Sequence, residues 1–295
     1  MKNKIIIGSR GSKLALVYAE RARKELLKIQ RIQNIEIKSI LTKGDSVKDI
    51  RLSEYGGKGL FCKAIEQELL DKKIDIAVHA LKDMPSVETI GLTTNCFLKR
   101  NDPREILISN NDKNIRSLKM NAIIGTSSFR REFQIKNIRK DLNCKLIRGN
   151  IDTRIKKLNE NLYDAIILSS AGIKSLGLEK KISQTFSTSE IIPSAGQGVI
   201  ALQRRSNDDE LGEILSKVNH KPTNDCIAAE RNVLKILGGD CETAIGAFAY
   251  IDKNEIILEA ELFSLDGSER FYIKSSKDSN LSNKLGIEVG EELRI

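Results

Sequence analysis

Arginine recurs at three places where a strand-like run of this sequence passes into a helical pattern. These places are GSRGS at 8–12, GTSSFRR at 125–131 and IRGNIDTR at 147–154. A helix N-terminus offers free N–H groups and the positive end of the helix dipole, and both favour bound anions. Guanidinium groups add forked donors that suit carboxylates and phosphates. The three junctions therefore predict sites for an acidic ligand, and the candidate residues are Arg10, Ser12, Ser128, Arg130, Arg131, Arg148 and Arg154.

A further candidate site follows the apolar run DIAVHA at 75–80, where the chain continues into Lys82 and Asp83. Ligands of open α/β sheets bind at the carboxyl ends of strands, so both side chains are expected near a ligand. An aspartate there can act as an acid or base, or as an anion that faces a developing cation. Lys58 lies between glycines just before a helical pattern, and it belongs either to the ligand site or to a surface hinge.

Cys241 stands in LKILGGDCETAIGAF (234–248), directly after two glycines and an aspartate. Structural cysteines usually sit inside apolar runs, so this thiol is expected on a solvated loop. On the residues alone it is either an incidental surface thiol or a reactive one. The chain has five cysteines without a CxxC pair and only two histidines, so no metal site is expected.

The charge balance indicates an acidic partner, because 49 Lys and Arg residues face 40 Asp and Glu residues, a formal net charge of +9. Nucleic acid and a small polyanion both suit such a charge. Aromatic content is only 4% and no nucleic-acid-binding motif occurs, which disfavours nucleic acid. The absence of GxxxxGK[ST] and GxGxxG disfavours nucleotides. Neither a membrane span nor export is expected, and the unpaired cysteines suit a reducing cytosol.

Strand-like runs and helical patterns alternate through the first two thirds of the sequence. This alternation predicts parallel sheets with right-handed crossovers in two α/β domains. After 191–205 the pattern changes to one long helix, three strand-like runs and a last helix, typical of a small α+β domain. The predicted strands are 4–9, 35–41, 74–80, 122–127, 144–149, 164–170, 244–251, 255–264 and 269–276, and the predicted helices are 12–29, 60–70, 129–138, a segment through 154–158, 222–237 and 281–293.

Taken together, the motifs of this chain resemble those of the porphobilinogen deaminase family, in the family's order and over nearly the whole length. They are GSRGSKLAL, GGKGLF, DIAVHALKDMP, GTSSFRR, IRGNIDTR and PSAGQGVIALQ, followed by the glycine and cysteine turn at 238–241. The resemblance implies two α/β domains similar to the lobes of periplasmic-type binding proteins and a small α+β third domain. The implied boundaries are 1–98 with 199–219 for the first domain, 99–198 for the second and 220–295 for the third.

The resemblance also implies an activity. Members of this family join four porphobilinogen molecules head to tail with loss of ammonia, on a dipyrromethane held by a cysteine thioether, and then release hydroxymethylbilane. Cys241 matches the attachment site, and Asp83 matches the catalytic aspartate that faces pyrrole N–H groups. Each pyrrole carries an acetate and a propionate, which gives the arginines a common purpose. The implied cofactor-binding residues are Lys82, Asp83, Ser128, Arg130, Arg131 and Arg148, and the implied substrate-binding residues are Arg10, Ser12, Lys58, Arg148 and Arg154.

Some positions depart from the family pattern and affect the expected anchoring of substrate. Asp240 is inserted before Cys241, and Ser175 stands where an arginine is typical. We expect a monomeric cytosolic transferase of tetrapyrrole and haem biosynthesis, without nucleic-acid or membrane partners. One alternative is a non-catalytic protein of two-lobed fold that binds a small polyanion and needs neither Asp83 nor Cys241. A nucleic-acid binder is the other, and it predicts binding that falls steeply with salt.

Overall fold

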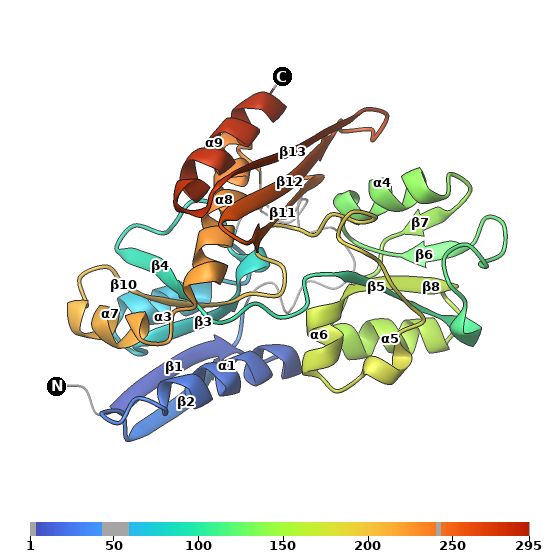
Figure 1. Cartoon of the computed structure of the whole chain (residues 1–295). Coiled ribbons are helices and arrows are strands. Elements are labelled where there is room, and N and C mark those ends of the chain that lie inside the picture. The colour runs from blue at the N-terminus through green and yellow to red at the C-terminus, as the bar shows by residue number, and fades with distance from the viewer. Residues whose placement is uncertain (1–3, 43–58, 240–242, 295) are drawn as a thin grey trace.

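Three β-sheets, each with its own helices, form the computed structural model, which describes residues 4–42, 59–239 and 243–294 (Figure 1). Two sheets have five strands and the third has three. In Figure 1 the two larger sheets lie on opposite sides of the molecule, and the three-stranded sheet lies above them with the last helix. The predicted fold class, two α/β units and a smaller α+β unit, is confirmed.

The first sheet has the strand order β2-β1-β3-β10-β4 and carries helices on both faces. Along β1, Ile5 and Ile7 pack on the side of α1 and α7, whereas Ile6 packs with the residues of α3 on the other side. This alternation follows the two-residue period of a strand. Its elements are β1 (Lys4–Arg10), α1 (Lys13–Leu26), β2 (Asn34–Ile40), α3 (Lys63–Leu70), β3 (Ile76–Ala80), β4 (Leu92–Phe97), β10 (Ile200–Arg205) and α7 (Asp209–Ser216).

The second sheet repeats this plan with the order β7-β6-β8-β5-β9. Ile135 of α4 packs in the cluster on one face, and Leu158 of α5 packs in the cluster on the other face. Its elements are β5 (Glu105–Ser109), β6 (Ile123–Gly125), α4 (Phe129–Ile138), β7 (Asn143–Lys145), α5 (Ile151–Asn159), β8 (Ala165–Ser169), α6 (Ser170–Ser175) and β9 (Gln184–Thr185).

The expectation of parallel sheets holds for only part of each larger sheet. β1 is parallel to β2 and β3, but β10 is antiparallel to β3 and β4. Likewise β6 is parallel to β7 and β8, but β5 is antiparallel to β8 and β9. β5 and β10 are the strands by which the chain enters the second sheet and returns to the first. Because neither is reached through a strand–helix–strand crossover in its own sheet, nothing requires it to run parallel to its neighbours.

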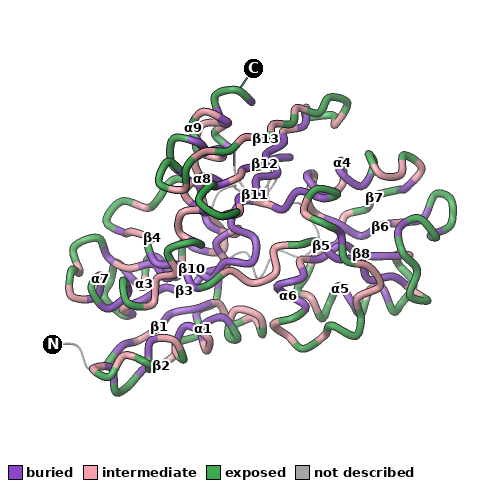
Figure 2. The backbone as a smooth tube through the Cα atoms, viewed as in Figure 1, coloured by how far each residue is buried: buried purple, intermediate pink, exposed green. Residues whose placement is uncertain are grey.

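The third unit consists of the antiparallel sheet β11-β12-β13 packed against two helices. The predicted helix at 222–237 corresponds to the long helix of this unit, which ends at Gly238, whose φ of 64° gives the left-handed conformation that commonly terminates a helix. The elements are α8 (Lys221–Leu237), β11 (Ile245–Asp252), β12 (Glu255–Phe263), β13 (Arg270–Asp278) and α9 (Ser282–Leu293). Figure 2 shows that burial concentrates on the inner strands of the two larger sheets and on β11 and β12 of the third, while the outer faces of the helices are exposed.

Two crossovers, residues 98–104 and 191–199, connect the two larger sheets and hold each other by hydrogen bonds. The N–H of Asn101 donates to the carbonyl of Gly198 at 2.8 Å, and Nε2 of Gln197 donates to the carbonyl of Pro103 at 2.6 Å. Glu230 of α8 is fully buried beside them and forms an ion pair with Arg100. The crossovers are therefore fixed to each other and to the third unit.

Candidate active site

Asp83 lies on a short 3₁₀ turn, η2 (Leu81–Asp83), at the carboxyl end of β3. The turn is anchored to the returning crossover, because the N–H of Leu81 donates to the carbonyl of Val199 at 3.0 Å. The thiol of Cys62 donates to the carbonyl of Asp83 at 3.6 Å. Lys82 and Asp83 are both half-buried. The turn thus presents a carboxylate and an ammonium group at the strand end where ligands of α/β sheets bind.

A pocket of about 430 Å³, counted with its open mouth, is lined by Asp83 together with Arg10, Ser12, Tyr18 and Phe61. The guanidinium of Arg10 lies over the ring of Phe61, 4.0 Å from its centroid, a cation–π contact that limits its movement. Ser12 caps α1, since its hydroxyl accepts from the N–H of Ala15 at 3.3 Å. Burial, with the nearby charge of Asp83, raises the pKa of Tyr18 to about 12, so its phenol stays protonated.

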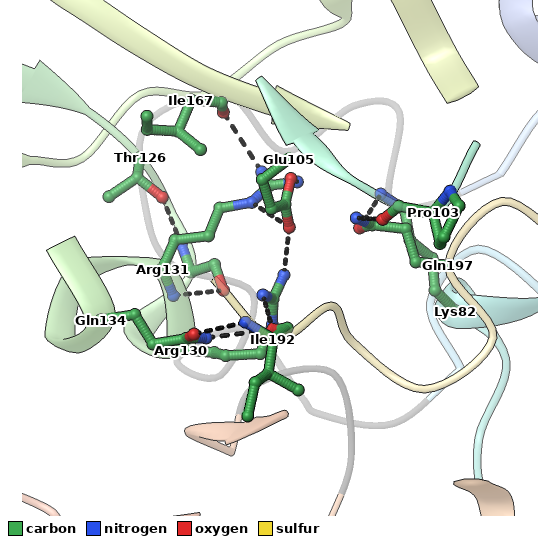
Figure 3. Close-up of polar contacts among 11 residues, drawn as sticks. Lys82, Pro103, Glu105, Thr126, Arg130, Arg131, Gln134, Ile167, Ile192 and Gln197 are labelled. Atoms are coloured by element: carbon green, nitrogen blue, oxygen red, sulfur yellow. Dashed lines mark hydrogen bonds and ion pairs between the residues drawn. The ribbon is translucent and has the colours of Figure 1, made fainter. Parts of the chain in front are cut away.

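Across from this turn, the N-terminus of α4 carries two arginines that point inward. Ser128 caps the helix by accepting from the N–H of Arg131. Arg130 and Arg131 are 3% and 7% exposed, and both donate to the carboxylate of Glu105, at 2.6 Å from Arg130 and at 2.8 and 3.0 Å from Arg131 (Figure 3). Arg130 also donates to the carbonyl of Ile192 at 2.6 Å. The two predicted ligand arginines are thus held by a protein carboxylate.

Arg148 and Arg154 belong to the third predicted junction, around the start of α5. Nε of Arg154 donates to the carbonyl of Gly149 at 2.9 Å, which fixes the side chain against the loop before the helix. Burial and the positive charges of Arg131 and Arg148 lower the pKa of Arg154 to about 10, while the charge of Asp83 opposes this shift. Arg154 is therefore close enough to all three groups to sense their charges.

The strand ends of the two larger sheets converge on one site. Burial and the charge of Arg131 lower the pKa of Lys82 to about 8, and Asp83 and Glu105 partly offset the shift. Nζ of Lys82 also donates to Oε1 of Gln197 at 3.4 Å, in the crossover (Figure 3). The site therefore combines cations from both sheets around a carboxylate of the first sheet. Such a set of donors suits a small molecule with several acidic groups.

Two predicted site residues, Lys58 and Cys241, lie outside the described residues. The segment next to Cys241 is nevertheless connected to the turn that carries Asp83, because the hydroxyl of Ser86 donates to the carbonyl of Gly239 at 3.2 Å. Arg231 of α8 also donates to the carbonyl of Pro85. The third unit therefore holds the chain that follows Asp83.

Three residues at this site were not predicted from the sequence: Tyr18, Glu105 and Gln197. Glu105 had a detectable signal, since it opens the apolar run EILIS, in which all five residues are buried. A charged residue at such a position requires buried partners. Tyr18 was covered only by the predicted helix at 12–29, and Gln197 only by the motif PSAGQGVIALQ. Neither pattern shows which side chains face the site.

No cluster of three or more His, Cys, Asp or Glu residues suited to a metal ion is found in the described part of the chain. Within residues 4–42, 59–239 and 243–294, no helix combines the length and the apolar composition that crossing a membrane requires. Cys96, Cys144 and Cys226 are free thiols.

Cations from two α/β units surround the carboxylate of Asp83. The fold and the site therefore define the class of this protein as a lobed α/β protein suited to acidic small molecules. A family model described as porphobilinogen deaminase, dipyromethane cofactor binding domain, matches residues 5–213. A second, described as porphobilinogen deaminase, C-terminal domain, matches residues 224–294. The chain belongs to the porphobilinogen deaminase family. These enzymes are transferases, and the alternative of a non-catalytic polyanion-binding protein is not favoured.

Curated relatives agree with this assignment over nearly the full length. Porphobilinogen deaminase of Staphylococcus carnosus strain TM300 is 42% identical over 293 residues, which cover 99% of this chain and 94% of that protein. Porphobilinogen deaminase of Geobacillus sp. strain WCH70 is 45% identical over 279 residues, 94% of this chain and 89% of that protein.

Solved structures similar to this chain include two binding proteins. One is the probable amino-acid ABC transporter extracellular-binding protein YtmK from Bacillus subtilis, with 12% identity, a TM-score of 0.43 and coverage of 74% of this chain and 90% of that one. The other is the aliphatic sulphonate binding protein SsuA from Escherichia coli, with 11% identity, a TM-score of 0.42 and coverage of 80% and 70%.

Proposed function

We propose that this chain joins porphobilinogen molecules with loss of ammonia and that Asp83 is its catalytic residue. The observation that carries the proposal is the position of Asp83, at a strand end beside a pocket and within range of the charge of Arg154 from the other sheet. Departure of ammonia leaves positive charge on the pyrrole of the substrate. A fixed carboxylate at that place stabilises the charge as it develops.

The cations around Asp83 are proposed to hold the acidic side chains of the pyrroles. For the substrate we assign Arg10, Ser12, Lys58, Arg148 and Arg154. The residues present also fit the family's dipyrromethane, a polyacid, because Lys82, Arg131, Arg148 and Arg154 gather on one site. We assign Lys82, Asp83, Ser128, Arg130, Arg131 and Arg148 to this cofactor and Cys241 to its covalent attachment. When bound, the dipyrromethane supplies the pyrrole carbon to which substrate is joined.

The proposed ligand-binding residues differ in how they contribute to binding. The buried arginines are anchored by protein oxygens, which keeps their donors fixed while an acidic chain is bound. The protonated Tyr18 phenol can donate a hydrogen bond in the pocket beside Asp83. Each charge-assisted hydrogen bond contributes about 1.5–3 kcal/mol, so several together can hold a chain that must also move between subsites.

We further propose three domains, 1–98 with 199–219, 99–198 and 220–295. The position of β10 in the first sheet and the third hydrophobic cluster around α8 and α9 support these boundaries. We also propose a monomer in a reducing cytosol, and the free thiols of Cys96, Cys144 and Cys226 support the reducing setting.

The test is the intact mass of the purified protein beside Cys241→Ser and Asp83→Asn variants, followed by an assay of porphobilinogen consumption. We expect a mass excess of one dipyrromethane in the parent and in Asp83→Asn, and none in Cys241→Ser. Asp83→Asn should lose about 10²–10³-fold in turnover, the usual effect of removing one stabilising group. A parent that neither gains the adduct after incubation with porphobilinogen nor consumes it would refute the function. A fully active Asp83→Asn variant would refute the catalytic role alone.

A further inference from the structure

Glu105 is a fully buried carboxylate with three charge-assisted hydrogen bonds at the edge of the proposed site. Nε and Nη2 of Arg131 donate to Oε1 and Oε2 of Glu105, and Nη2 of Arg130 donates to Oε1 (Figure 3). A two-point contact between a guanidinium and a carboxylate fixes the plane of the guanidinium as well as its position. Glu105 therefore determines the orientation of Arg131.

The direct contacts of Glu105 contain more positive than negative charge, because this one carboxylate pairs with two arginines. Lys82 adds a further cation nearby and Asp83 a further anion, since the pKa of Lys82 responds to Arg130, Arg131, Glu105 and Asp83. A buried pair that served stability alone would be balanced, because an uncompensated buried charge is costly. The excess of positive charge is explained if an acidic ligand neutralises it when it binds.

Arg131 retains donors for such a ligand. Its Nη1 donates to the carbonyl of Ile167 at 3.2 Å, in addition to the two bonds to Glu105. Within the described part of the chain, Arg131 thus uses three of the five N–H groups that a guanidinium carries. Two are left on a side chain whose plane is already fixed.

We propose that Glu105 is a positioning residue, which orients Arg131 and Arg130 before the carboxylates of the cofactor arrive. The inference rests on the proposed function, in which both arginines bind the carboxylates of the cofactor to which substrate is joined. Preorganisation of this kind lowers the cost of ordering the donors at the moment of binding. Glu105 itself touches neither ligand and acts only through the two arginines.

The negative charge of Glu105 has a second effect, on Lys82. The groups that face Lys82 are Asp83 on its own turn, Arg130 and Arg131 of α4, Glu105 of β5 and, as a neutral acceptor, Gln197 of the crossover. Glu105 and Asp83 raise the pKa of Lys82, whereas burial and the arginines lower it to about 8. Loss of the charge of Glu105 must therefore move this pKa further down, toward neutral pH.

The experiment compares Glu105→Gln, Glu105→Asp and the control Glu132→Gln, which removes the charge of a half-buried acid of α4 that pairs with Lys136 and not with Arg130 or Arg131. KM and kcat for porphobilinogen are measured from about pH 6.5 to 9.5, and intact mass gives the fraction of each protein that carries dipyrromethane. For Glu105→Gln we expect KM to rise at least tenfold, the loaded fraction to fall and the basic limb of kcat/KM to move to lower pH. Glu105→Asp should raise KM and leave the basic limb in place, and Glu132→Gln should match the parent.

A parent-like KM and an unmoved basic limb in Glu105→Gln would overturn the inference. Should Glu105→Gln fail to fold, Glu105→Asp decides, because it retains the charge but shortens the side chain: a parent-like KM and loaded fraction would then overturn the inference. Failure of the proposed function is distinguishable, since in that case the parent itself consumes no porphobilinogen.

Discussion

Replacing Glu230 with glutamine should cost this protein about 3–5 kcal/mol of unfolding free energy. Glu230 is 0% exposed, and each of its oxygens accepts two hydrogen bonds. Oε1 accepts from Arg100 and from the N–H of Ala249, and Oε2 accepts from Arg100 and from the N–H of Gly196. A glutamine amide must place its NH₂ group against two donors in either orientation. It also leaves the charge of Arg100 without its buried partner, which sets the magnitude.

Urea denaturation followed by far-UV circular dichroism measures this loss. Asp225→Asn is the matched control, because it removes a carboxylate from the same helix, where Asp225 pairs with the largely exposed Lys221 at 2.8 Å. An exposed pair contributes about 0–1 kcal/mol, so the control should remain close to the parent. If Glu230→Gln and Asp225→Asn lose equal stability, the reasoning that α8 is docked through this buried carboxylate is refuted.

Two further predictions concern stability. Gly198→Ala should destabilise the protein more than Gly177→Ala. Both glycines have a positive φ, at 82° and 68°, and placing an alanine in that conformation costs about 1–3 kcal/mol. Of the two, only Gly198 lies where the added Cβ would meet a backbone atom, the carbonyl oxygen of Asn101 at 2.8 Å. Equal losses in thermal unfolding would show that the close approach of the crossovers does not matter. Glu261 is fully buried, and burial raises its pKa from 4.5 to about 7, so the folded state binds a proton more readily than the unfolded state. The parent should therefore lose stability relative to Glu261→Gln as pH rises from about 4.5 to 8, by up to about 3 kcal/mol, and parallel pH profiles of the two proteins would contradict the raised pKa.

The elements with a clear period were predictable from the sequence. The helix at 129–138 matches α4 residue for residue, and the helix at 222–237 differs from α8 only at its first residue. β5 and β10 were missed, because nearly all of their residues are buried and their runs lack the alternation of a half-buried strand. Their antiparallel direction depends on the crossovers, which no local pattern encodes.

The candidate site was predictable as a set of residue types but not as a set of contacts. Arginines at strand-to-helix junctions, with Asp83 at a strand end, indicated an acidic ligand. The structure adds that Arg130 and Arg131 share one protein carboxylate, Glu105. Glu105 lies on β5, which β8 separates from β6, the strand that precedes α4. Such a pairing arises only when the chain has folded, because more than 20 residues separate its members.

The place of β10 in the first sheet has a consequence for biosynthesis. β10 lies between β3 and β4, so the ribosome has synthesised every strand of the second sheet before the first sheet can be completed. The second sheet is built from one continuous stretch, 105–185, and can assemble as soon as that stretch has emerged. Contacts distant in sequence form late because loop closure must precede them. During translation β3 and β4 therefore lack the strand that pairs with both of them until β10 has been synthesised. The same segment brings Val199, which accepts a hydrogen bond from the turn that carries Asp83.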